Sequence, residues 1–197
     1  MKKIRLTTTI MVMAFLSLTA MSCKDLKKEN AHNNTMHSEM NHDEMSASND
    51  TMDSNSQNTG AQPILANYMV LKEALVATNQ DIAAKAGKNL ESTLNSFDVS
   101  SYTSEQQEDL KDIISDAKEQ AGLIGKSEIG SQREHFKVLS KNITDMVAIT
   151  GTEDTLYQQF CPMYDGGTAW LSMNKEIKNP YYGSKMLTCG KVQKEIN

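Results

Sequence analysis

The sequence ILANYMVLKEAL at residues 64–75 decides the fold, because its large apolar side chains recur at helical spacing. Successive members of this set lie four, three and four residues apart, which places them on one face of an α-helix. The set consists of Ile64, Tyr68, Leu71 and Leu75. The stretch therefore predicts the first amphipathic helix of a helical domain.

Three further helical patterns follow along the chain. The second apolar stripe consists of Ile82, Ala86, Leu90, Leu94 and Phe97. The third helix should begin at Thr103 or Ser104, with a glutamine in capping-box position, and end at Gly122 or Gly125. Its stripe consists of Leu110, Ile113, Ile114, Ala117 and Ala121. The fourth opens at Ser127, ends at Gly151 and buries Phe136, Leu139, Ile143 and Met146. Because the connections are short, neighbouring helices should run antiparallel, and we expect an all-α, up-down four-helix bundle.

The helical period stops after Gly151. Residues 152–160 are expected to form one more short helix, with its inner face made by Leu156, Tyr157 and Phe160. Residues 161–190 hold the only tryptophan, two of the three prolines and four of the ten glycines of the chain, and show no period of 3.6 or 2. We therefore expect an irregular C-terminal cap at 161–190, within a domain that spans 64–192, and a tail at 193–197.

Residues 1–22 have the features of a secretory signal. Three basic residues precede an apolar run at residues 10–18, which is too short to span a membrane. Ala20 and Ser22 then precede Cys23, an arrangement that resembles a bacterial lipoprotein signal, although Ala20 stands where leucine is usual. The resemblance implies that Cys23 is lipidated and anchors the protein to a membrane of the cell envelope, on its periplasmic or outer-membrane side. The alternative is cleavage near Ser22 with a free Cys23.

The charge balance of the chain limits which classes of binding partner can be expected. Without the signal, 17 Lys and Arg face 25 Asp and Glu, a net charge of −8. An acidic chain without a basic cluster is a poor partner for nucleic acid or for an anionic membrane surface, so membrane contact should come from the lipid alone. The phosphate-binding motifs GxxxxGK[ST] and GxGxxG and the nucleophile elbow GxSxG do not occur. We therefore expect a binding protein without an organic cofactor, and not an enzyme.

The N-terminal arm, residues 23–63, should be a disordered tether. From Lys24 to Pro63 it has no aromatic residue and one large aliphatic residue, so burial cannot offset its ordering entropy. Within it, the stretch MHSEMNHDEM at 36–45 interleaves thioethers and imidazoles. Its candidate metal ligands are Met36, His37, Met40, His42 and Met45.

These side chains suit copper. Thioether sulfur is a soft, uncharged ligand for Cu(I), and imidazole binds copper in either oxidation state. A histidine pKa of about 6.5 leaves the imidazoles mostly neutral at neutral pH. The stretch resembles the Met- and His-rich segments of bacterial periplasmic copper-resistance proteins. It is predicted to collect copper with modest affinity, because ordering opposes binding; the alternative is a low-complexity tether without a ligand role.

The two remaining cysteines form a second candidate site. Cys161 and Cys189 each lie two or three residues from a methionine, Met163 and Met186 respectively. Together these side chains would supply two thiolates and two thioethers, a set suited to Cu(I). The alternative is a structural disulfide worth about 3 kcal/mol, with the methionines as core filler, and spacing alone favours it because neither half has CxxC spacing. His135 could add an imidazole, although a partly exposed helix position explains it more simply.

Several separated blocks resemble a family of exported helical domains, domain of unknown function 3347. The blocks are YMVLKEAL (68–75), FCPM (160–163), AWLS (169–172), KEI (175–177), NPYYG (179–183) and MLTCG (186–190). The resemblance covers about 64–192. Family members occur as small lipoproteins and as domains appended to periplasmic adaptor subunits of heavy-metal efflux pumps.

The resemblance implies an association with copper or related metals, with Cys161, Met163, Met186 and Cys189 as candidate ligands, and it leaves the disulfide open. We expect an envelope lipoprotein that binds Cu(I) or Cu(II) for sequestration or for hand-over to an efflux adaptor. The first alternative is a structural or interaction module with a plain disulfide. The second, a thiol oxidoreductase, is disfavoured because the chain has neither a CxxC motif nor a thioredoxin-like βαβ pattern.

Overall fold

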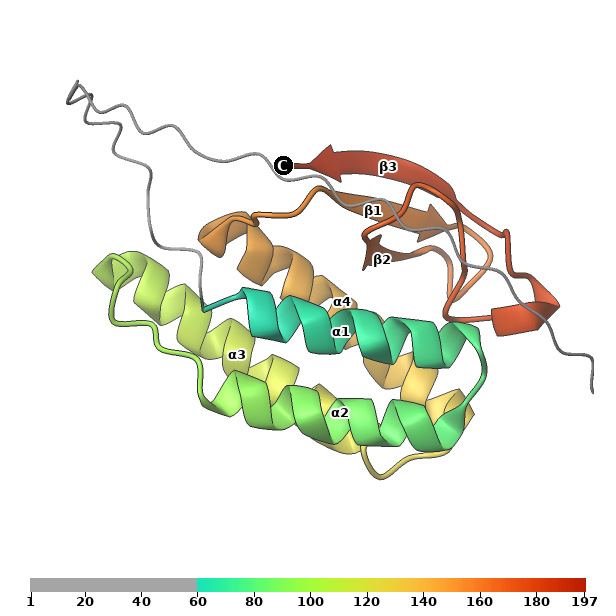
Figure 1. Cartoon of the computed structure of the whole chain (residues 1–197), viewed down its shortest axis with the longest axis horizontal. Coiled ribbons are helices and arrows are strands. Elements are labelled where there is room, and N and C mark those ends of the chain that lie inside the picture. Colours follow the sequence, from blue (N-terminus) through green and yellow to red (C-terminus); the bar gives the residue numbers. More distant parts are fainter. Residues whose placement is uncertain (1–59) are drawn as a thin grey trace, which may run out of the picture. The chain divides into compact units, whose positions relative to one another are not determined.

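The computed structural model describes residues 60–197, which form four α-helices followed by a small antiparallel sheet (Figure 1). The helices are α1 (Gln62–Val76), α2 (Gln80–Asn95), α3 (Ser104–Ile124) and α4 (Ile129–Thr150). The strands are β1 (Leu156–Cys161), β2 (Thr168–Ser172) and β3 (Lys191–Ile196), with a short 3₁₀ helix η1 (Gly183–Lys185) before β3. None of these helices is long and apolar enough to cross a membrane. The four expected helices are confirmed.

Side-chain caps explain where α2 and α3 begin. Thr103 caps α3 in a capping box, since its hydroxyl accepts from the backbone N–H of Gln106 at 3.3 Å while the Gln106 side chain accepts from the Thr103 N–H at 3.1 Å. Asn79 caps α2 by accepting from the N–H of Ile82 at 3.0 Å. Between these helices Gly87 permits close approach, because a Cβ there would lie 2.8 Å from the carbonyl oxygen of Ala121.

The region after α4 corrects two expectations. Residues 156–161 form the central strand of a sheet with the order β2-β1-β3, so the expected short helix at 152–160 is wrong and the fold is mostly helical rather than all-α. Residues 193–196, expected in a tail, belong to β3. A six-residue segment is too short for its periodicity to separate strand from helix, and the partners that make it a strand lie elsewhere in the sequence.

The sheet and the helices share one core. The sheet lies over α1 and α4 (Figure 1), and the ring of Phe136 on α4 stacks on Tyr68 of α1 at 5.2 Å between centroids. On its other side the Phe136 ring packs against the ring of Tyr181, with 5.8 Å between centroids. The Tyr181 ring in turn packs against Trp170 of β2, with 5.9 Å between centroids. The buried Tyr68 hydroxyl accepts from the backbone N–H of Leu171 at 3.1 Å. This series of aromatic contacts joins the sheet and the helices in one hydrophobic core.

Arg133 of α4 connects three segments. Its guanidinium donates to the carbonyl oxygen of Pro180 at 3.0 Å, to that of Leu75 at 3.2 Å and to the hydroxyl of Thr78 at 3.0 Å. Arg133→Ala should lower the free energy of unfolding by about 2 kcal/mol, because hydrogen bonds to a charged group are lost and the carbonyl oxygen of Pro180 is left unpaired. Urea unfolding measures the change.

Arg133→Lys is the control for that substitution. A lysine ammonium keeps the charge but cannot reproduce the planar fork, so it should recover only part of the loss. A lysine variant as stable as the native protein would show that the fork geometry contributes nothing.

Candidate metal site

The candidate site is a pair of cysteines brought together by strand pairing. Cys161 ends β1, and Cys189 lies two residues before β3. The two strands are antiparallel neighbours, with Phe160 opposite Lys191, so the residues that flank this pair come together. The two thiols are free and hydrogen-bonded to each other.

The two thiols differ in exposure. Cys161 is completely buried, whereas Cys189 is half-buried and opens into a cavity of about 320 Å³ that Pro162 and Lys191 also line. Gly190 follows with φ +148°, and a Cβ there would lie 3.0 Å from both the Phe160 carbonyl oxygen and the Trp170 ring. A glycine is therefore needed where the Cys189 segment joins β3.

A buried asparagine holds the Cys189 segment in place. The Asn179 side chain donates to the carbonyl oxygen of Cys189 at 2.8 Å and accepts from the N–H groups of Tyr181 and Tyr182 at 2.8 and 3.2 Å. Tyr182 in turn donates its hydroxyl hydrogen to the carbonyl oxygen of Met163 at 2.8 Å. The NPYYG segment thus positions both halves of the site. Sequence reasoning assigned no role to Asn179 or Tyr182, and the only signal was their place in the NPYYG block, one of those on which the expected family resemblance rested.

Met163 and Met186 lie close to Cys161 and Cys189 in the sequence, and both methionines are exposed. The Met163 N–H hydrogen-bonds to the Cys189 sulfur, and the Cys189 N–H donates to the Met186 carbonyl oxygen at 3.0 Å. Met163 and Met186 are 63% and 39% exposed. Both residues are therefore open to solvent, and their backbones contact Cys189.

Other predicted ligands are not part of this group. His135 lies between helices, with its Nδ1 3.0 Å from Oε1 of Gln120 on α3. Among residues 60–197, no cluster of three or more His, Cys, Asp or Glu side chains could hold a metal ion. The arm residues Met36, His37, Met40, His42 and Met45, and the lipidation residue Cys23, lie outside the described residues.

Contact with Cys161 favours the protonated form of the Cys189 thiol. The hydrogen bond with Cys161 raises the pKa of the Cys189 thiol, burial adds to this rise, and the Met163 N–H opposes it. A metal ion binds the thiolate form, so binding must release protons from the pair and should strengthen as pH rises.

This raised pKa predicts the alkylation behaviour of Cys189. Iodoacetamide reacts with thiolate, so the pH midpoint of Cys189 alkylation should lie above the value of about 8.5 for a free cysteine. Cys161 should react more slowly at every pH because it is buried. Peptide mass mapping of the reduced protein measures both rates.

Cys161→Ala provides the matched variant for that measurement. It removes the hydrogen bond that raises the pKa and should lower the Cys189 midpoint. A midpoint that stays unchanged in Cys161→Ala would show that Cys161 does not raise the pKa of Cys189.

Comparison with known protein families identifies the family of the helical part of the chain. Residues 64–155 match the family model described as a protein of unknown function (DUF3347). The match runs from α1 to the residue before β1, so it includes the four helices and leaves the strands and the thiol pair outside. No curated protein and no solved structure matches the chain. The helical domain of this chain, residues 64–155, therefore belongs to the DUF3347 family.

Proposed function

We propose that this protein is a lipid-anchored envelope protein that binds copper and sequesters it or passes it to a heavy-metal efflux partner. The observation that supports the proposal most is the pair of free thiols, Cys161 and Cys189, which are in contact beside a surface cavity and have an exposed methionine two or three residues away in the chain. The protein acts by binding and releasing the ion, not by catalysis.

The donor set favours Cu(I) over other envelope metals. A structural Zn²⁺ site takes four tetrahedral ligands from Cys, His and carboxylates, and in residues 60–197 no third side chain of these kinds stands near the thiols. Hard cations prefer oxygen ligands. Thiolate and thioether sulfur select Cu(I), which leaves Met163 and Met186 as the natural additional ligands.

The unequal burial of the two thiols suits transfer. Cys161 can hold the ion from the interior, while Cys189 faces a cavity through which a partner's soft ligand can approach. The partner would replace the Cys189 sulfur first and the Cys161 sulfur second. The N-terminal arm would collect copper through its methionines and histidines and supply the pair.

A Cu(I) titration against a competing chelator, without oxygen, tests this proposal. The full chain should bind Cu(I) with a dissociation constant tighter than about 1 µM at the thiol pair. Deleting residues 31–53 should lower the amount of copper bound and leave this tight site unchanged. Binding no better than about 1 mM would contradict the proposal, and a capacity unaffected by the deletion would contradict the arm's role.

The contact between the thiols also favours a second function, an interaction module stabilised by a Cys161–Cys189 disulfide. Oxidation of the pair would close a long loop and stabilise the fold by about 3 kcal/mol. Mass mapping without reductant of protein taken from the envelope distinguishes the two functions. A complete disulfide with no metal retained would favour the interaction module.

A further inference from the structure

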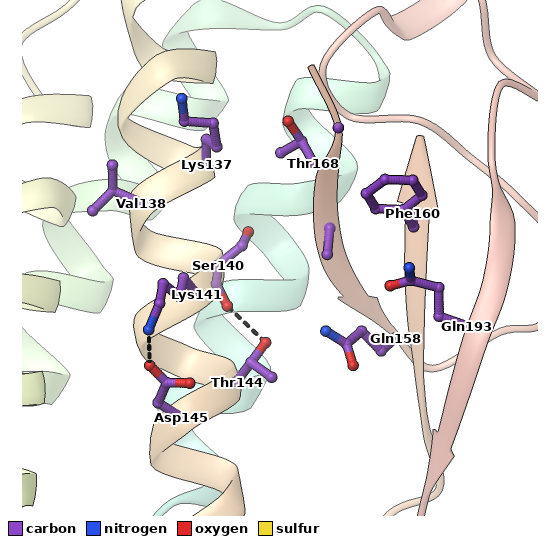
Figure 2. A pocket seen from close by; sticks show the side chains of 12 residues that line it. Lys137, Val138, Ser140, Lys141, Thr144, Asp145, Gln158, Phe160, Thr168 and Gln193 are labelled. Atoms are coloured by element: carbon purple, nitrogen blue, oxygen red, sulfur yellow. Dashed lines mark hydrogen bonds and ion pairs between the residues drawn. The ribbon is translucent and has the colours of Figure 1, made fainter. Parts of the chain in front are cut away.

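A larger cleft of about 460 Å³ lies between α4 and the sheet, apart from the thiol pair (Figure 2). One wall is α4, and the other is formed by the three strands, which contribute Gln158, Phe160 and Gln193 among others. This volume lies within the range of roughly 300–1,000 Å³ typical of small-molecule sites. The chemistry of the two walls indicates what the cleft can bind.

A β-bulge points one glutamine at the cleft. Gln158 of β1 pairs with Lys194 and Gln159 pairs with Val192, so Gln193 between them has no partner on β1. Bulges re-aim side chains and often occur next to binding sites. Gln193 and Gln158 both line the cleft (Figure 2), and within residues 60–197 neither side-chain amide has a hydrogen-bond partner.

The cleft has no excess charge. Lys141 is paired with Asp145 at 2.5 Å, and Lys137 is paired with Asp165. Each ammonium is therefore neutralised by a carboxylate, which removes the main reason for an anion to bind. The pairing favours an uncharged ligand.

The polar groups of the cleft call for a ligand that both donates and accepts hydrogen bonds. The Thr144 and Thr168 hydroxyls already donate to backbone carbonyl oxygens at 2.7 and 2.9 Å, so toward the cleft they can only accept. The two free amides offer donors and acceptors together. A carboxylate only accepts and would leave these acceptors unpaired, whereas hydroxyl groups satisfy both kinds. The half-buried Phe160 ring adds an apolar surface.

We propose that this cleft binds a neutral saccharide. Gln158 and Gln193 would bind sugar hydroxyls through their amides, the threonine oxygens would accept from further hydroxyls, and the C–H face of the sugar ring would lie against Phe160. Phe160 also lines the cavity at Cys189, but none of the proposed copper ligands within residues 60–197 lines this cleft, so saccharide binding does not depend on copper.

Side-chain amide NMR of the full, ¹⁵N-labelled chain tests the site. Cellobiose and N,N′-diacetylchitobiose are the probes, with succinate as a carboxylate and N-acetylalanine methylamide as a peptide-backbone analogue. One of the disaccharides should shift the Nε2 signals of Gln158 and Gln193 saturably, with a dissociation constant on the order of 1 mM. Gln158→Leu combined with Gln193→Leu should weaken that binding at least about tenfold, as read from the backbone signals of α4.

Gln62→Leu is the matched control, because it makes the same change on α1 away from the cleft and should leave the affinity unchanged. Well-dispersed spectra of the double variant confirm that it is folded. The proposal is overturned if neither disaccharide shifts these signals up to about 20 mM. It is equally overturned if only succinate or the peptide analogue shifts them, or if the double variant binds as tightly as the native chain.

Discussion

Replacing Cys161 with serine should remove tight Cu(I) binding and weaken the affinity at least about hundredfold, because a hard hydroxyl replaces a soft thiolate in a site with few ligands. Cys189→Ser should have a comparable effect, since the two sulfurs hold the ion together. A competition titration measures each variant in the chain that lacks residues 31–53, so that copper held by the arm does not mask the loss. Met163→Leu and Met186→Leu should have smaller effects, because both methionines are exposed.

Met173→Leu is the control for these substitutions, because Met173 is also an exposed methionine, at 41%, and is not next to a cysteine in the chain. Its affinity for Cu(I) should equal that of the native protein. Cys161→Ser buries a hydroxyl, so helical circular dichroism must show that the variant is folded. A folded Cys161→Ser protein that keeps the native affinity would exclude the thiol pair as the copper site.

Phe136→Ala should cause a large loss of stability, about 3–5 kcal/mol in the free energy of unfolding. The Phe136 ring is completely buried and lies between Tyr68 of α1 and Tyr181 beneath the sheet, so its removal leaves a cavity shared by both parts of the fold. Urea unfolding measures the loss. Helical circular dichroism and the fluorescence of Trp170, the only tryptophan, should show coincident transitions.

Val138→Ala is the matched control on the same helix. Val138 is 41% exposed, so its truncation should change stability by no more than about 0.5 kcal/mol. If Phe136→Ala moves the fluorescence transition but leaves the helical transition in place, the sheet unfolds separately and the single shared core is wrong.

The helices could be predicted from the sequence because their determinants are local. The stripe from Ile64 to Leu75 and the capping box at Thr103 each involve residues within a few positions of one another. These signals persist for fifteen residues or more in α1, α2, α3 and α4, which is enough for the period of 3.6 to be recognised.

The strands could not be predicted in this way. β1 has six residues, and its side chains Leu156, Tyr157 and Phe160 fit one turn of a helix as well as a strand. It becomes a strand because β2 and β3 pair with it on either side. The bulge at Gln193, and with it the cleft, depends on the register of that pairing.

The sequence by itself determined four helices and two cysteines each accompanied by a methionine, because helical period and residue chemistry are local properties. Only the tertiary structure decided that Cys161 and Cys189 meet, with one thiol buried and the other open to solvent. The physical reason is that the β1–β3 pairing and the contacts of Asn179 join segments separated in sequence, and no local pattern encodes which distant segments will pair.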